Sequence, residues 1–78
     1  MEKKKLSELS IGDKGGVTAV GGEGLIRRRL FDMGITPGAE LYLRKKAPLG
    51  DPYEITIRGY ELSLRKAEAE NVTVEVKR

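Results

Sequence analysis

The stretch from residue 25 to residue 38 constrains this 78-residue chain most, because it joins a helical pattern to two turn signals. It reads Leu-Ile-Arg-Arg-Arg-Leu-Phe-Asp-Met-Gly-Ile-Thr-Pro-Gly. At about 100° per residue, the apolar side chains of a helix over residues 24–33 fall on one face. That predicted buried stripe consists of Leu25, Ile26, Leu30 and Met33.

The end of this helix is well marked. Gly34 stands where a left-handed residue commonly ends a helix, and the following Ile35 can then contact Leu30. The next four residues, Thr-Pro-Gly-Ala over 36–39, fit a type II turn with proline second and glycine third. The sequence therefore predicts a sharp helix stop followed by a chain reversal.

Apolar residues alternate with a period of two along most of the remaining chain, which is typical of half-buried strands. Leu6 and Leu9 lie one helical turn apart and are expected to tuck under a barrel edge, and residues 66–70 suit a second short helical turn. Residues 1–78 are predicted to form one domain whose first five residues are flexible. The pattern favours a mainly β fold, a small and partly open antiparallel barrel of about five strands with one short helix after the first strand. The predicted strands are 17–20, 40–46, 53–58, 61–65 and 72–76.

The hairpin formed by two of these strands can be given a register from the sequence. If Gly59 and Tyr60 form a two-residue type II′ turn, Arg58 faces Glu61. Ile55 then faces Leu64, and every cross-strand pair is matched in polarity or opposite in charge.

Few side chains of this sequence are suited to ordinary active-site chemistry. The chain has no histidine and no cysteine, so it lacks the usual general base, the thiol nucleophile and the imidazole and thiolate metal ligands. We therefore expect no enzymatic activity, no catalytic residue and no required cofactor, and any binding of Fe²⁺ or another divalent ion would be weak and through carboxylates. The glycine-rich residues 21–24 lack the lysine of a phosphate-binding P-loop. No apolar run reaches the ~20 residues that span a bilayer.

The arginines of the predicted helix are the best candidates for function. Arg27 and Phe31 lie opposite the apolar stripe, and an exposed aromatic beside arginine has the composition of an interface hot spot. Arg28 is spaced to pair with Asp32. The stem of Arg29 can lie along the barrel while its charged head reaches water. The predicted partner-binding residues are Leu25, Arg27, Arg28, Arg29, Phe31 and Asp32.

At these residues the chain resembles the ferrous iron transport protein A (FeoA) family. The resemblance rests on Leu6-x-x-Leu9 with Gly12, on Gly21-Gly22, and on the run from Arg27 to Gly38. Further matching pieces are Asp51-Pro52, Arg58-Gly59-Tyr60, Leu64-Arg65-Lys66, Glu68-Ala69 and residues 72–75.

The resemblance implies an SH3-like barrel that serves bacterial ferrous iron uptake as a cytoplasmic accessory protein. Its partner would be the cytoplasmic side of a membrane permease that contains a GTPase, whose transport it would modulate. Transition-metal binding is attributed to this superfamily, although this chain lacks the histidine and cysteine of metal-ligating versions.

Two alternatives stay open on the residues alone. One is a regulatory domain that binds a divalent metal ion weakly through carboxylates. The other is a small-barrel nucleic-acid binder, for which the evidence is thin, because the net charge of +3 is spread along the chain and aromatic residues are few.

Overall fold

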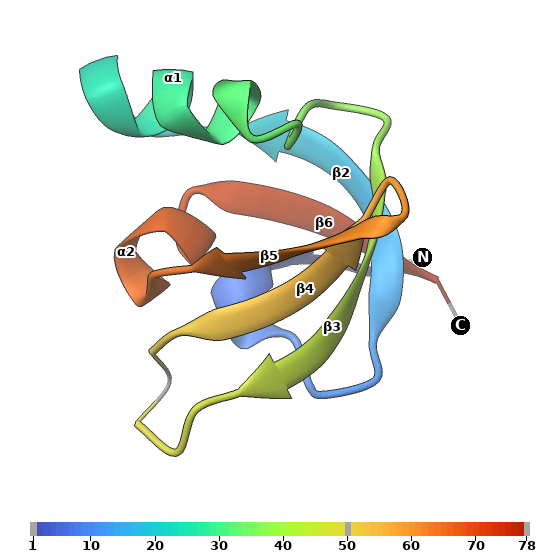
Figure 1. Cartoon of the computed structure of the whole chain (residues 1–78). Coiled ribbons are helices and arrows are strands. Elements are labelled where there is room, and N and C mark those ends of the chain that lie inside the picture. The colour runs from blue at the N-terminus through green and yellow to red at the C-terminus, as the bar shows by residue number, and fades with distance from the viewer. Residues whose placement is uncertain (1, 50, 78) are drawn as a thin grey trace.

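Six strands form one antiparallel sheet that curls around the interior of the protein (Figure 1). This computed structural model describes residues 2–49 and 51–77. The strand order across the sheet is β1-β6-β2-β3-β4-β5. The strands are β1 (Glu2–Lys5), β2 (Lys14–Val20), β3 (Glu40–Lys46), β4 (Tyr53–Ile57), β5 (Tyr60–Leu64) and β6 (Val72–Lys77). The mainly β prediction is confirmed.

Three short helical segments connect the strands. They are the 3-10 helix η1 (Leu6–Glu8), the helix α1 (Gly24–Asp32) and the helix α2 (Lys66–Ala69). Each lies where the sequence placed a helix or helical turn. The two ends of the sheet, β1 and β5, each pair with one neighbour only.

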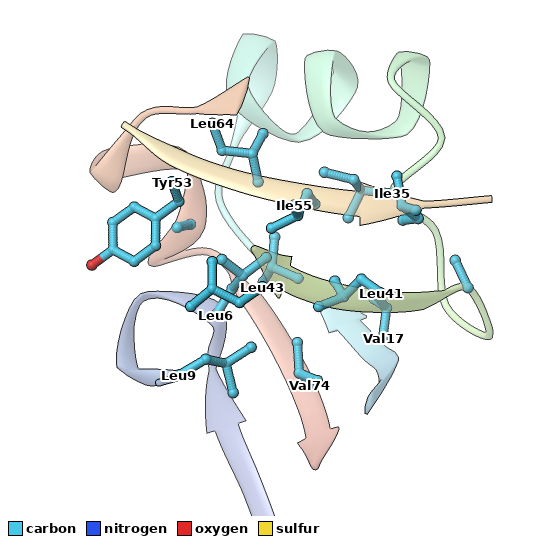
Figure 2. Close-up of a cluster of buried hydrophobic side chains, with 14 of the residues drawn as sticks. Leu6, Leu9, Val17, Ile35, Leu41, Leu43, Tyr53, Ile55, Leu64 and Val74 are labelled. Atoms are coloured by element: carbon cyan, nitrogen blue, oxygen red, sulfur yellow. The ribbon is translucent and has the colours of Figure 1, made fainter. Parts of the chain in front are cut away.

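The core follows from the alternation of the strands. Successive side chains of a strand point to opposite faces, so every second residue faces inward. The inward residues of β6, namely Val72, Val74 and Val76, are at most 1% exposed. Leu6 and Leu9 close one side of the core from η1 and the residue after it, as predicted (Figure 2). Tyr53 is also buried, and its hydroxyl donates to the Ser7 carbonyl at 3.0 Å.

The expectation of a flexible segment over residues 1–5 is corrected for residues 2–5. These residues form β1, which pairs with β6 so that Glu2 lies opposite Val76 and Lys5 opposite Thr73. The three lysines carry no apolar alternation, and the strand is held by backbone pairing with a core strand. Residue 1 lies outside the described residues.

The predicted register of the β4–β5 hairpin is wrong by two residues. Ile57 lies opposite Tyr60 and Ile55 opposite Leu62, so that the turn consists of Arg58 and Gly59. Both turn residues have positive φ, 51° and 84°, as a type I′ turn requires. A slip of two residues leaves each side chain on its expected face, which is why the predicted inward residues are still correct.

Candidate protein-docking site

Helix α1 stands off the sheet, and its N-terminal turn lies farthest from the strands (Figure 1). Residues 21–29 form an unbroken exposed run, and Leu30 is the only fully buried residue of the helix. An isolated helix of nine residues is marginal in water, so α1 depends on its anchors to the barrel. These anchors are mostly polar.

The C-terminal end of α1 is closed by a Schellman motif. The Ile35 amide donates to the Leu30 carbonyl and the Gly34 amide to the Phe31 carbonyl, both at 3.0 Å. Gly34 has a φ of 90°, which favours glycine. The predicted type II turn follows, with the Ala39 amide donating to the Thr36 carbonyl at 3.0 Å. Both sequence predictions for this joint are confirmed.

The tip of the β4–β5 hairpin binds this helix end. The Tyr60 hydroxyl donates to the Met33 carbonyl at 2.8 Å. The Arg58 guanidinium donates to the Gly34 carbonyl at 3.3 Å and to the Thr36 hydroxyl at 2.9 Å. Arg58, whose backbone has a positive φ, thus uses its side chain to hold the hairpin tip against the end of α1.

Arg27 holds the helix on its other side. Its Nε donates to the Val20 carbonyl at 3.3 Å, and its guanidinium lies 5.0 Å from the centre of the Phe31 ring. The expectation that Phe31 turns fully outward is corrected, because the side chain is half-buried and packs against the core. Arg27 therefore covers an aromatic ring that is itself part of the barrel wall.

Arg29 reaches the second helix. Its Nε pairs with the Glu68 carboxylate at 2.8 Å, and Glu68 also accepts the Arg65 backbone amide at 2.9 Å. The side chain of Glu68 is only 9% exposed, whereas that of Arg29 is 65% exposed. A nearly buried carboxylate thus has both of its oxygens paired, as burial requires.

The predicted apolar stripe of α1 is only half correct. Leu30 is buried and Met33 packs partly against the core, but Leu25 is 83% exposed and Ile26 is 38% exposed. The periodicity assumed that the sheet extends under the whole helix, and the sheet does not reach its first turn. Two apolar side chains are thereby left on the surface.

Arg28 and Asp32 are both exposed. Among the residues that the structure describes, no ion pair joins them, although the spacing of four residues allows one. Of the six predicted partner-binding residues, five are therefore exposed on α1 and Phe31 forms the base of the surface beside Arg27.

A concave pocket of about 340 Å³ lies between α1 and α2. Its wall combines residues from four segments, namely Arg29, Asp51, Pro52, Ser63, Leu64, Arg65 and Glu68. Of these residues, the sequence predicted a functional role only for Arg29. Several of the others entered only as pieces of the family resemblance, without a role. The one available signal was the Arg65-x-x-Glu68 spacing, in which a glutamate accepts the amide three residues earlier.

Residues 2–49 and 51–77 contain neither a cluster of metal-ligating side chains nor a membrane-spanning helix. These residues contain no group of three or more histidine, cysteine, aspartate or glutamate side chains placed to hold a metal ion. No described helix is long and apolar enough to cross a membrane. The exposed α1 surface is therefore the best-developed candidate site in the described part of the chain.

Taken together, the curled six-stranded sheet and the projecting helix define a small SH3-like domain. Residues 4–76 match the family model described as the FeoA domain. The chain belongs to the FeoA family, as its sequence resemblance predicted.

Three relatives illustrate the similarity. An Fe(2+) transport protein A/Fe(2+) transporter FeoB fusion protein of Porphyromonas gingivalis is 38% identical over 72 residues, which are 92% of this chain. The chain spans only 8% of the length of that fusion protein. The solution structure of a FeoA-like protein from Clostridium acetobutylicum is 44% identical, with a TM-score of 0.90 over 100% of this chain and 91% of that one.

The third relative is a Stenotrophomonas maltophilia FeoA solved with zinc. It is 31% identical, with a TM-score of 0.77 over 90% of this chain and 87% of that one. It is described as a procaryotic SH3 domain protein that possibly acts as a ferrous iron transport activating factor. The predicted SH3-like fold is confirmed by this likeness.

Proposed function

We propose that this chain is a non-enzymatic accessory protein of bacterial ferrous iron uptake, which binds the cytoplasmic, GTPase-containing part of a FeoB-type permease and modulates transport. The fusion of a related domain to an Fe(2+) transporter supports the partner, because fused domains act at the same place and at a high effective concentration. A separate chain must achieve the same proximity by binding. This role places the chain in the cytoplasm.

The observation that carries the proposal is the exposed face of α1. Leu25 projects into solvent two residues before a run of three arginines, on a helix that the barrel holds mainly by its C-terminal half. An apolar side chain beside arginines is a composition enriched at protein interfaces. Arg28 has no ion-pair partner among the described residues and is free to contact another protein.

A pulldown against the cytoplasmic part of the permease tests this role. The variant carrying Leu25→Asp and Arg28→Glu should bind at least about tenfold more weakly. Both substitutions remove a side chain that is expected to contact the partner at the centre of the interface. Both residues are exposed, so the fold should be unaffected. The matched control carries Leu49→Asp and Lys45→Glu, which change an exposed apolar and an exposed basic residue away from α1.

The control variant should bind like the parent. Equal binding by the α1 variant and the parent would show that the assigned face is wrong, and no binding by the folded parent would reject the partner.

Divalent-metal binding through carboxylates is the second candidate, and it is favoured only by the zinc in the Stenotrophomonas maltophilia relative. Addition of Fe²⁺ or Mn²⁺ under anaerobic conditions, followed by backbone amide shifts, separates it from the first. Saturable shifts at carboxylate residues would support a metal-responsive domain. An unchanged spectrum at millimolar ion would remove that candidate.

A further inference from the structure

The pocket between α1 and α2 has an uneven set of polar groups. Both of its carboxylates are already engaged: Glu68 by Arg29 and the Arg65 amide, and Asp51 by the Lys66 amide at 3.2 Å. The Arg65 guanidinium and the Ser63 hydroxyl have no partner among the residues that the structure describes. The terminal nitrogens of Arg29 also point to no acceptor within that part of the chain.

The pocket groups that have no hydrogen-bond partner in the described residues can therefore donate hydrogen bonds. Two of the three are arginine guanidinium groups. Arginine presents a planar fork of N–H groups that matches a carboxylate with two parallel hydrogen bonds. The bound Glu68 fixes Arg29 at its Nε, so that less side-chain entropy remains to be lost when a ligand binds. The pocket is thus suited to an acceptor with a negative charge.

The strand that lines the pocket adds a second feature. Among residues 2–49 and 51–77, β5 ends the sheet and pairs only with β4. Because Ile57 and Tyr60 flank a two-residue turn, they exchange backbone hydrogen bonds, and the alternate residues Glu61 and Ser63 turn their amides and carbonyls to the open edge. Ser63 therefore offers free backbone groups at the edge and belongs to the pocket wall.

We propose that this pocket binds the carboxylate of an acidic side chain carried by an extended segment of a partner protein, which lies along the open edge of β5. An extended peptide satisfies the free backbone groups of an edge strand, and its side chains then enter adjacent pockets. The partner protein is the permease only if the proposed function holds, whereas the pocket chemistry stands without it.

Two short peptides test the pocket independently of the permease. Acetyl-Val-Thr-Glu-Thr-Val-amide should shift the amide signals of Ser63 and Arg65 in a saturable manner, at millimolar concentration. The same peptide with Gln in place of Glu should bind at least about tenfold more weakly, since it cannot form charge-assisted hydrogen bonds. Equal shifts by both peptides, or shifts confined to other strands, would overturn the proposal.

Substitution assigns the effect to one side chain. Arg65→Gln should abolish the preference for the glutamate peptide, and Lys3→Gln, on the opposite edge strand β1, should retain it. Retention of the preference by a folded Arg65→Gln protein would contradict the assignment. A third titration adds sodium phosphate or sodium acetate in place of a peptide. Shifts at Ser63 and Arg65 that either salt saturates, with no further change on adding the peptide, would show a site for free anions and reject the extended segment.

The permease pulldown separates the two proposals. If the parent binds the permease through α1 and Arg65→Glu weakens that binding about tenfold, the pocket belongs to the same interface. If the glutamate peptide binds and the permease does not, the pocket proposal survives and the proposed function fails. If Arg65→Glu binds the permease as the parent does and neither peptide binds, the pocket proposal fails alone.

Discussion

The barrel and the helix α1 are stabilised in different ways. The inward residues of the strands are buried apolar side chains, and the sheet that carries them is continuous from β1 to β5. Helix α1 contributes one fully buried residue, Leu30, and the half-buried Phe31, and is otherwise held by hydrogen bonds and an ion pair at separate points. A chain of this size can therefore leave most of a helix exposed without exposing its core, and the exposed face is available to a partner.

The largest expected effect comes from the fully buried residue of α1. Leu30→Ala should destabilise the protein by about 2–5 kcal/mol, because it leaves a cavity where α1 meets the core. Leu25→Ala on the same helix should change stability by no more than about 0.5 kcal/mol. Urea unfolding of the two variants measures the contrast. Similar losses in both would mean that α1 packs more tightly than its exposure indicates.

The helix end gives the next largest effect. Gly34→Ala forces a methyl-bearing residue to a φ of 90° and brings its Cβ within 2.6 Å of the Tyr60 hydroxyl. We expect a loss of about 2 kcal/mol or more from strain and clash combined. Gly12→Ala is the matched control, because its φ is 96° and its Cβ would meet open space.

The difference between these two glycine variants in thermal unfolding isolates the clash. If the methyl group added by Gly34→Ala clashes with the Tyr60 hydroxyl, adding Tyr60→Phe to that variant should recover part of the lost stability. Equal destabilisation by both glycine variants would show that the hairpin tip does not press against the end of α1.

The ion pair between α1 and α2 should behave asymmetrically. Glu68→Ala removes an acceptor from both Arg29 and the Arg65 amide and should cost about 1–2 kcal/mol. Arg29→Ala removes a guanidinium that is 65% exposed, and water from the adjoining pocket can then reach the Glu68 carboxylate, so this variant should cost less than about 1 kcal/mol. Chemical denaturation of both single variants and the double variant gives the coupling. A larger loss of unfolding free energy for Arg29→Ala than for Glu68→Ala would contradict the view that Glu68 is the more important member of this ion pair.

The smallest effect belongs to the barrel surface. A hydrogen bond from Lys77, together with its positive charge, lowers the pKa of Glu40 below its ordinary value of 4.5. A carboxylate whose pKa is lowered on folding stabilises the protein above its unfolded pKa, and this contribution is lost as the pH falls through the folded value.

Parent and Glu40→Gln should therefore differ slightly in thermal stability at about pH 7 and converge as the pH falls through the lowered pKa of Glu40. In a Lys77→Gln background the difference should be smaller, because only the weaker attraction of Glu40 to the charge of Lys14 is left. An unchanged difference in that background would mean that Lys77 is not the main partner of Glu40.

The sequence predicted the barrel better than the position of α1. Strand alternation identified Val72, Val74 and Val76 as core residues, and local turn chemistry identified the helix stop at Gly34. Both signals depend on neighbours in the chain. The exposure of Leu25 depends on how far the sheet extends beneath the helix, which no local pattern contains.

Tertiary contacts also explain the incorrect hairpin register. A glycine-first turn favoured Gly59 and Tyr60, but the side chains of Arg58 and Tyr60 both bind the end of α1. Those contacts accompany a turn of Arg58 and Gly59 instead. The pocket between α1 and α2 was missed for the same reason, since residues such as Asp51 and Glu68 meet only after folding. The partner-binding role of the α1 residues stays a prediction.

One measurement tests the central proposal most directly. The isotope-labelled chain is titrated with the cytoplasmic part of a FeoB-type permease, and the amide shifts are followed residue by residue. We predict that the largest changes fall on residues 25–29 of α1, with little change on β1 and β3. Saturable changes concentrated on the lysines of β1, with α1 silent, would contradict the assignment of α1 as the docking surface.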